Sequence, residues 1–461
     1  MQPTHSQKFG LMLDSVRRLI RAGGTVRAMN ILRKARPADV AQVLHTLNDL
    51  DRHAVFAALS RSDTELAAAS LSELELEEGV ELLTALAPEG IAQVLQELPS
   101  DDAALFIAEL PETLRDRLLE LMKVEASTDV QELLSFAEGT AGRIMTPNVF
   151  SLNEDLTVGE AISAIQRTSR EVEMVFYLYV VDERNHLVGV VSLRQLLLVP
   201  PTTPLKKIMS TDVISVRTDT DQEEVARIVA RYNLLGVPVV DAENKLEGLI
   251  TVDDIIDVIR EEATEDIYAL AGVRSDEHAQ SAPGRSVRLR LPWLLVNLAT
   301  AVLASSVVHL FEATIERVVV LATLMPIVAG MGGNAGTQTL AVVVRGLALG
   351  EVTWENSRRV VIKEIIVGLA NGVANGLVAA LIVLVWFGFN VKMLLIGGII
   401  AVAMVLNLLL AGIGGTLIPV ILKRLKADPA LASTVFVTTL TDVGGFLSFL
   451  GLAALLLRYL S

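Results

Sequence analysis

Long runs of apolar residues without charge dominate the C-terminal part of the chain. Four such runs hold no Asp, Glu, Lys or Arg, and a fifth holds a single acid, Asp442; they cover residues 291–311, 318–344, 365–391, 393–422 and 429–457. About 20 apolar residues suffice to cross a bilayer. A helix satisfies every backbone polar group inside lipid. The pattern therefore predicts five transmembrane helices.

The first 138 residues show a different, shorter pattern. Units led by a proline recur at Pro37, Pro88, Pro99 and Pro111, and each continues with acidic and then apolar positions. Proline at a helix start and acids in the first turn mark short helices. The repetition predicts an all-α N-terminal domain whose helices stack as a superhelix.

Residues 139–262 contain an internal repeat. The segment 143–151 matches 207–215 at an offset of 64, and 180–192 matches 239–251 at an offset of 59. Each copy alternates as a strand, a helix, two strands joined by a tight turn, and a final helix. The repeat predicts an α/β domain that is built twice.

Composition supports a chain that is part soluble and part embedded in a membrane. The 461 residues are 52% hydrophobic, with a mean hydropathy of +0.50, yet 20% of them are charged. Residues 1–284 carry a net charge of −21 and residues 285–461 carry +6, out of a total of −15. The expected fold class is thus a multidomain membrane protein with a superhelical N-terminal domain, a tandem α/β pair and an α-helical membrane domain.

Several classes of protein are excluded by residue types. The chain has no cysteine, which rules out disulfides, zinc–thiolate sites and iron–sulfur clusters. Its six histidines show no metal-ligand spacing. The acidic soluble part argues against binding to nucleic acid. The first 24 residues lack the apolar segment of a cleavable signal peptide.

Basic residues in the loops predict the orientation in the membrane. Ten would lie on one side and three on the other: Arg285, Arg288, Arg290, Arg345, Arg358, Arg359, Lys363, Lys423, Arg424 and Lys426 against Arg317, Lys392 and Arg458. Loops rich in Lys and Arg remain in the cytoplasm. We expect a cytoplasmic N-terminus and, after five spans, a C-terminus outside.

Asp442 is the main candidate for chemistry in the membrane. A carboxylate near the bilayer centre costs roughly 3 kcal/mol on insertion scales, so it should face water, an ion or a partner. The spans offer no Lys or Arg deep enough to pair with it, which favours a pathway for ions or protons.

The glycine-flanked Asn334 in residues 326–339 predicts a bent helix beside a polar cavity, although glycines in spans also serve close helix packing.

A second candidate is the acidic run between residues 253 and 266. It holds seven acids in fourteen residues, and Asp254, Asp257, Glu261 and Glu265 fall on one stripe of a helix. A solvated helix face is one interpretation. The other is a set of oxygen donors that divalent cations bridge, since Mg²⁺ and Ca²⁺ prefer such ligands.

The internal repeat resembles a tandem pair of CBS domains. The segment Thr251-Val-Asp-Asp254 is similar to the family's ribose-contacting motif, whereas the first copy has Ser192 and Gln195 at the matching positions. The resemblance implies an adenine-nucleotide or ion sensor. It makes Thr251 and Asp254 candidate nucleotide-binding residues, with ATP as the candidate cofactor.

The order of the parts resembles the MgtE family of magnesium channels. The most specific segments are 332–339, 262–268 and 428–442. The resemblance implies a homodimer in a bacterial inner membrane that admits Mg²⁺ passively. Asp442, Asn334 and Thr438 would line its pore, and cytoplasmic Mg²⁺ would close it by binding acids of the N domain, the CBS pair and the linking helix. Those acids are Asp101, Asp102, Asp254, Asp257, Glu262, Glu265 and Asp266.

The corresponding domains are expected at residues 1–138, 139–200, 201–262, 263–286 and 287–461, where 263–286 is the linking helix.

The nearest alternative function is a secondary transporter coupled to H⁺ or Na⁺. A sensor that conducts nothing would not need Asp442, and an enzyme would need a nucleophile–base pair or a metal cluster that the sequence does not provide. Residue types leave selectivity among Mg²⁺, Co²⁺, Mn²⁺ and Ca²⁺ open.

Overall fold

The computed structural model describes residues 5–147, 149–168, 176–274, 277 and 283–460. The chain forms two compact units, Met1–Ile259 and Arg260–Ser461, and each is described by itself. The division falls inside one helix, α14 (Val252–Leu270).

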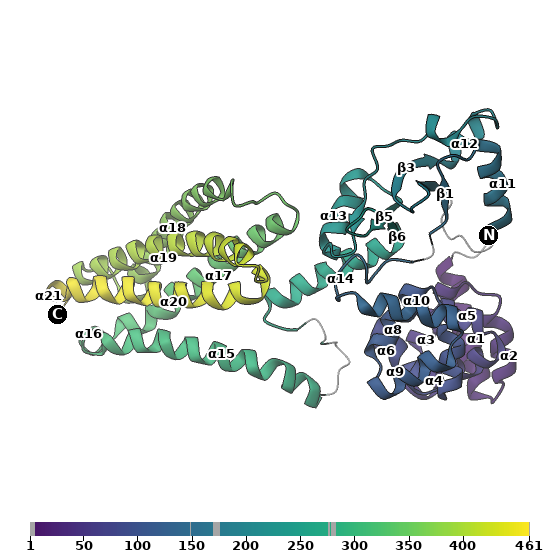
Figure 1. The fold of residues 1–461 in the computed structure, drawn as a ribbon. Coiled ribbons are helices and arrows are strands. Elements are labelled where there is room, and N and C mark those ends of the chain that lie inside the picture. Colours follow the sequence, from purple (N-terminus) through teal and green to yellow (C-terminus); the bar gives the residue numbers. More distant parts are fainter. Residues whose placement is uncertain (1–4, 148, 169–175, 275–276, 278–282, 461) are drawn as a thin grey trace. The chain divides into compact units, whose positions relative to one another are not determined.

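The first unit begins with a stack of short helices (Figure 1). These are α1 (His5–Arg21), α2 (Thr25–Leu32), α3 (Pro37–Thr46), α4 (Asp49–Ser62), α5 (Thr64–Ser72), α6 (Leu76–Thr84), α7 (Pro88–Leu95), α8 (Ser100–Glu109), α9 (Glu112–Leu121) and α10 (Val124–Ser135). From α2 onward each helix packs against the helix two further along. Pro37 and Pro88 occupy the first turn of their helices, where the missing N–H costs nothing. The all-α stack confirms the prediction from the proline-led units.

Two small α/β domains follow. The first contains β1 (Ser151–Asn153), α11 (Val158–Thr168), β2 (Tyr177–Val181), β3 (Leu187–Ser192) and α12 (Leu193–Leu198); the second contains η1 (Leu205–Lys207), β4 (Val216–Arg217), α13 (Gln222–Tyr232), β5 (Gly236–Val240), β6 (Leu246–Thr251) and then α14. Both sheets have the same order, with a parallel pair followed by an antiparallel pair. The predicted alternation of strands and helices is confirmed in both copies.

Each copy contacts the other through an equivalent segment near its start. Met145, near the start of the first copy, packs on Gly248 of the second, and Met209, near the start of the second copy, packs on Gly189 of the first. A Cβ atom at Gly189 would lie 2.6 Å from the Met209 sulfur, so both glycine positions need the absence of a side chain. The hairpin turns pair as well, because the Asn185 amide donates to the Leu246 carbonyl at 2.9 Å and Asn244 donates to Leu187 at 3.0 Å.

The N-terminal helices and the second copy share one hydrophobic core. Phe56, Leu95 and Phe106 of the helices belong to the same buried cluster as Val237 and Ile250 of the second sheet. The first copy buries its own cluster. The helical domain is therefore packed on one copy of the pair.

The linking helix differs from the prediction. A helix was expected over 263–286, but α14 begins at Val252 and ends at Leu270. Its start is continuous with the second copy because no Gly or Pro interrupts residues 252–270. Its end is followed by Gly272 in the left-handed region, at φ +68°, which favours glycine and stops the helix. Residues 275–276 and 278–282 of the expected range lie outside the described residues.

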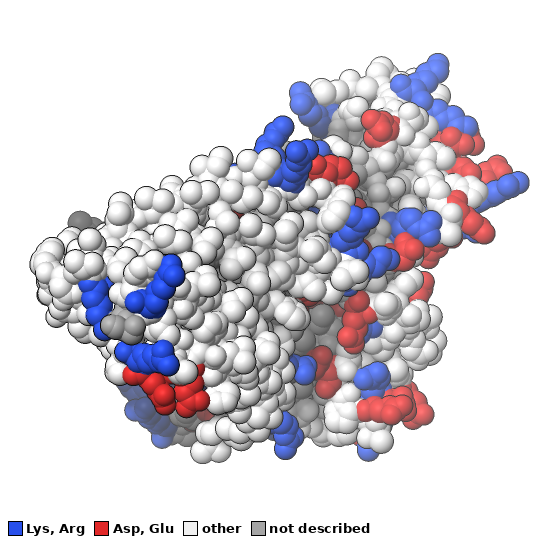
Figure 2. All heavy atoms as spheres, turned by 90° about the vertical axis from the view of Figure 1, so that its left-hand side faces the viewer, with Lys and Arg blue, Asp and Glu red and all other residues white. Residues whose placement is uncertain are grey.

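The second unit holds the long apolar helices. They are α15 (Pro283–Leu310), the short α16 (Glu312–Arg317), α17 (Val320–Ala348), α18 (Ser357–Phe387), α19 (Val391–Arg424), α20 (Pro429–Leu455) and the short α21 (Leu457–Leu460). Within the described residues, five are long and apolar enough to cross a membrane, as predicted. Figure 2 looks at the end of this unit that carries α16 and α21, and most of the nearest surface holds no charged side chain.

Helix α19 lies between α18 and α20 and packs against both, and against α17 (Figure 1). Its contact with α18 is backbone to backbone. A Cβ atom would lie 2.6 Å from the Leu408 carbonyl oxygen at Gly368, 2.7 Å from the Val405 Cα at Gly372, and 2.8 Å from the Glu364 carbonyl oxygen at Gly412. Small residues at every fourth position permit this close approach inside lipid. The packing interpretation thus holds for these glycines.

We expect Gly412→Ala to destabilise the second unit by about 1–3 kcal/mol, because the new methyl group would press on the α18 backbone. Gly398→Ala is the matched control on α19, since its Cβ would enter open space and change stability by less than about 1 kcal/mol. Thermal unfolding of both variants in detergent tests this. Equal midpoints for the two variants would contradict the packing argument.

Candidate cation sites

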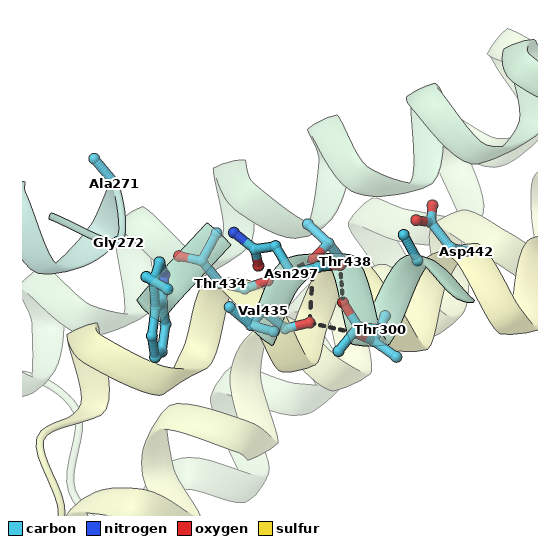
Figure 3. A pocket seen from close by; sticks show the side chains of 11 residues that line it. Ala271, Gly272, Asn297, Thr300, Thr434, Val435, Thr438 and Asp442 are labelled. Atoms are coloured by element: carbon cyan, nitrogen blue, oxygen red, sulfur yellow. Dashed lines mark hydrogen bonds between the residues drawn. The ribbon is translucent and has the colours of Figure 1, made fainter. Parts of the chain in front are cut away.

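A cavity of about 260 Å³ lies beside Asp442. It is formed by the chain just after α14, one face of α15 and one face of α20; its lining residues are Ala271, Gly272, Trp293, Asn297, Thr300, Ala301, Thr434, Val435, Thr438, Thr439 and Asp442. Figure 3 shows these residues in a row from Gly272 to Asp442, with Asn297 and Thr438 between them. All of them belong to the second unit.

The structure brings together two of the three predicted pore residues. Asp442 is half-buried and lies one helical turn after Thr438, so both side chains face the cavity from α20. Asn334 is exposed on α17 and does not line this cavity. Its neighbours Gly332 and Gly336 face the bundle, against Asn407 and Val437. A residue two positions from both glycines points to the opposite side of the helix.

The end of α14 is fixed at the mouth of the same cavity. The Thr434 hydroxyl donates to the Leu270 carbonyl at 2.9 Å. Gly272 lies so close to the Trp293 indole that any side chain there would collide with it. Ala269 and Leu270 pack with Leu340, Val344 and Ala430 in a small buried cluster. In this arrangement α14 ends against α15, α17 and α20.

The first unit gathers four of the predicted regulatory acids. Burial, with Asp254 and Asp102 nearby, raises the pKa of Asp101 to about 7. Burial also raises the pKa of Asp254, to about 6, and that of Asp102, which lies near Asp257 and Asp253. Thr146 donates to one oxygen of Asp101 at 3.1 Å, and Ser72 donates to Asp102 at 2.6 Å. Helix α8 and the start of α14 therefore face each other with carboxylates.

These acids have the chemistry that a hard divalent cation requires. The second oxygen of Asp101, Oδ1, is buried and has no hydrogen-bond partner among the described atoms. Such an atom is costly unless something satisfies it. In the part of the chain that the structure describes, however, no three His, Asp or Glu side chains are arranged to hold a metal ion. The acids are close together without forming a complete ligand set.

The other three predicted regulatory acids, Glu262, Glu265 and Asp266, belong to the second unit and lie further along α14. The pKa of Glu265 is raised by burial and by the nearby carboxylates of Glu262 and Asp428. Asp428 caps the start of α20, where its side chain accepts from the Ala430 N–H at 2.8 Å. Asp428 was not among the predicted site residues.

The predicted nucleotide residues are bonded to each other. The Thr251 hydroxyl donates to Asp254 Oδ2 at 2.6 Å and contacts Asp253, and Thr251 is only 6% exposed. A cavity of about 590 Å³ lies instead at the equivalent place in the first copy. It is lined by Phe176, Tyr177, Ser192, Leu193, Arg194, Leu197, Leu198 and Leu235. Leu235 comes from the second copy, so this cavity lies between the two.

Comparisons with known proteins give consistent matches for the N-terminal, CBS and membrane parts of the chain. The sequence model of MgtE, described as a divalent cation transporter, matches residues 325–452, and that of the MgtE intracellular N domain matches 35–139. CBS domain models match 141–201 and 205–261. The chain is 38% identical to the magnesium transporter MgtE of Thermus thermophilus over 346 residues, which cover 74% of this chain and 75% of that protein.

The chain belongs to the MgtE family of magnesium transporters. It is also 38% identical to MgtE of Enterococcus faecalis over 335 residues, 73% of each chain. A solved structure of the cytosolic domain of the Mg²⁺ channel MgtE in complex with ATP covers 53% of this chain and 99% of that chain at 36% identity, with a TM-score of 0.50. The soluble part of a magnesium transporter covers 55% and 99% at 31% identity, also at 0.50.

Two buried polar residues of this MgtE chain were missed in the sequence. Asn407 of α19 is fully buried, and its amide donates to the Val328 carbonyl at 2.8 Å. Glu364 of α18 is 5% exposed, accepts from Thr339 at 3.0 Å and pairs with Lys363 at 2.9 Å. A lone Asn within 393–422 was a usable signal for the first. The second, Glu364, lies one position before the uncharged run 365–391, so its position in the sequence gave no sign that it is buried.

The acid cluster predicts a pH dependence for the metal-free MgtE chain. A raised pKa means that the folded state holds protons which the unfolded state releases, so stability is greatest below about pH 4 for these groups. It should fall as pH rises to about 7, by about 4 kcal/mol for Asp101. Hydrogen exchange of α8 in the full chain with EDTA, corrected for intrinsic rates, measures this.

Asp101→Asn should flatten a large part of that pH profile, because the pKa of Asp101 is raised further than that of Asp254. Asp116→Asn, an exposed change on α9, is the matched control and should leave the slope intact. A profile in which α8 becomes better protected between pH 4 and 7 would show that the pKa values of these acids are not raised in the folded chain.

Proposed function

We propose that the chain conducts Mg²⁺ passively through a pathway that includes the cavity at Asp442. The half-buried carboxylate on α20, open to a cavity of about 260 Å³, is the observation that carries the proposal. A carboxylate at membrane depth is retained where it faces water or an ion. Mg²⁺ releases its waters reluctantly and is usually held by one or two carboxylates beside several waters. Asp442 and Thr438 fit that requirement.

The proposed assembly is a homodimer with one pathway at the two-fold axis, so that Asp442 occurs twice. The proposed orientation puts the N-terminal helices and the CBS pair in the cytoplasm and the C-terminus outside. The excess of Lys and Arg in the loops on one side supports this orientation. Asn334 remains a proposed pathway residue that would face a partner rather than the cavity of its own chain.

Closure by cytoplasmic Mg²⁺ is the proposed regulation. Asp101, Asp102, Asp254 and Asp257 would hold the ion between α8 and α14, and Glu262, Glu265 and Asp266 would contribute further along α14. The unsatisfied Asp101 Oδ1 and the mutual proximity of these acids support it. A cation bound there supplies positive charge that relieves their repulsion. It would thereby favour the conformation in which the acids are close.

The alternative remains a secondary transporter in which Asp442 exchanges H⁺ or Na⁺ against the metal. The two functions differ in their driving force. Passive conduction needs only the Mg²⁺ gradient and the membrane potential, whereas a coupled transporter stops when the H⁺ and Na⁺ gradients are removed.

Dye-reported Mg²⁺ entry into proteoliposomes at clamped potential, without a pH or Na⁺ gradient, tests the proposal. Asp442→Asn should lower entry at least about tenfold, because it removes the charge that attracts the ion and keeps the size of the side chain. Ser448→Ala on α20, which removes a hydroxyl bonded to the Gly445 carbonyl, is the control. Entry that appears only with an H⁺ or Na⁺ gradient would favour the coupled transporter.

The same proteoliposomes test the proposed regulation when the Mg²⁺ concentration is varied on the side of the soluble domains. Raising Mg²⁺ there should suppress entry through the intact chain, and Asp101→Asn should need more Mg²⁺ for the same suppression. Equal suppression curves for the two proteins would remove Asp101 from the regulatory site.

We further propose that the CBS pair binds ATP, as the solved MgtE cytosolic relative does. The cavity of about 590 Å³ favours the first copy as its site, because it offers two aromatic rings, Phe176 and Tyr177, and the cation Arg194. Aromatic rings suit a base and Arg suits phosphate. In the second copy, by contrast, Thr251 and Asp254 are bonded to each other.

Binding of ATP to single variants decides between the copies. Arg194→Ala should weaken binding roughly tenfold or more, as expected for loss of a charged hydrogen bond, while Thr251→Val should change it by less than about threefold. Calorimetric titration of the full chain measures both. The reverse order of effects would return the site to Thr251 and Asp254.

A further inference from the structure

We infer that α15 forms one wall of the cation pathway, with Asn297 and Thr300 as residues that contact the hydrated ion. The inference rests on the proposed pathway at Asp442 and adds the first span to it. Both side chains line the Asp442 cavity from α15, whereas Thr434 and Thr438 line it from α20 (Figure 3). They would help to determine which hydrated cations pass.

The placement follows from helix geometry. Trp293, Asn297 and Thr300 are spaced by four and three residues, so they share one face of α15. Thr434, Thr438 and Asp442 are spaced by four and share one face of α20. The two helices pack against each other. Between Pro292 and Ala304, Asn297 and Thr300 are the two α15 residues whose side chains carry oxygen, and both are at the cavity.

The hydroxyl groups in this cavity present acceptors. Thr300 donates its proton to the Asn297 carbonyl at 2.9 Å, Thr438 donates to Thr434 at 2.9 Å, and Thr439 donates to Val435 at 2.6 Å. Thr434 donates to Leu270 at 2.9 Å. With each proton used by a backbone carbonyl, each hydroxyl turns lone pairs to the cavity. Waters around a cation point their protons outward, so lone pairs and the Asp442 carboxylate match them.

The volume fits the same ligand. Six waters in octahedral arrangement around Mg²⁺ occupy roughly 180 Å³. The cavity of about 260 Å³ can therefore hold the ion with its waters, in contact with both walls.

Single cysteines test the inference, since the chain has none of its own. The Asn297→Cys and Thr300→Cys variants would be treated with a small cationic methanethiosulfonate. Dye-reported Mg²⁺ entry into proteoliposomes would be measured before and after the treatment. Ser306→Cys is the matched control, because Ser306 also donates to the backbone of α15, at 2.9 Å from the Val302 carbonyl oxygen, but lies away from the cavity. The first two should lose more than about tenfold of their Mg²⁺ entry on modification, since a fixed positive charge repels the ion.

A second set of variants separates contact with the ion from damage to the fold. Thr300→Val should lower Mg²⁺ entry roughly fivefold, the effect of one hydrogen bond, and change the ratio of Mg²⁺ to Ca²⁺ entry. Thr300→Ser keeps the hydroxyl and should restore both. A merely structural defect would lower the entry of both ions equally and leave their ratio unchanged.

The outcomes distinguish this inference from the proposed function. If Mg²⁺ entry depends on Asp442 but modification at Asn297→Cys and Thr300→Cys has no more effect than at Ser306→Cys, then α15 is not a wall and the inference is wrong. If entry does not depend on Asp442, the proposed pathway itself is wrong. Block at positions 297 and 300, with Asp442-dependent entry, supports both.

Discussion

Backbone contact between α18 and α19 is the constraint on which the rest of the membrane unit depends. At Gly368, Gly372 and Gly412 there is no room for a Cβ atom, so the two helices have one possible spacing. Helix α19 also packs against α17 and α20. At these glycine positions the backbones of α18 and α19 are too close to admit a water molecule between them. The space that can hold a hydrated ion lies where α20 meets the much more exposed α15.

This packing also divides the polar side chains of the unit into two kinds. Glu364 and Asn407 lie inside the packed part and are bonded to Thr339 and to the Val328 carbonyl. Asp442 instead lines a cavity. In the first unit, Asp101 is buried beside other acids, and burial together with those neighbours raises its pKa. Groups of this kind gain most from an ion that arrives from solution.

Patterns that extend over many residues were sufficient to predict the elements. Uncharged runs of membrane length predicted the five spans, and matched segments at two offsets predicted the paired sheets. Asp442 was found because it is the lone charge in its run. The face that a residue presents was harder to predict, since it depends on contacts between helices. The glycines beside Asn334 turn toward α19 and α20, which leaves Asn334 on the outer face. Asn407 was missed although it is the one Asn in its run, and Glu364 was missed because it lies just before an uncharged run.

The exchange of Met145 and Met209 between the CBS copies has a consequence for how this part of the chain folds. Each copy supplies the methionine that covers the hairpin glycine of the other, so a copy expressed alone would leave that glycine exposed. Neither copy is then a separate cooperative unit. A destabilising change in one should lower the stability of both, and a protease that opens one copy should gain access to the whole pair.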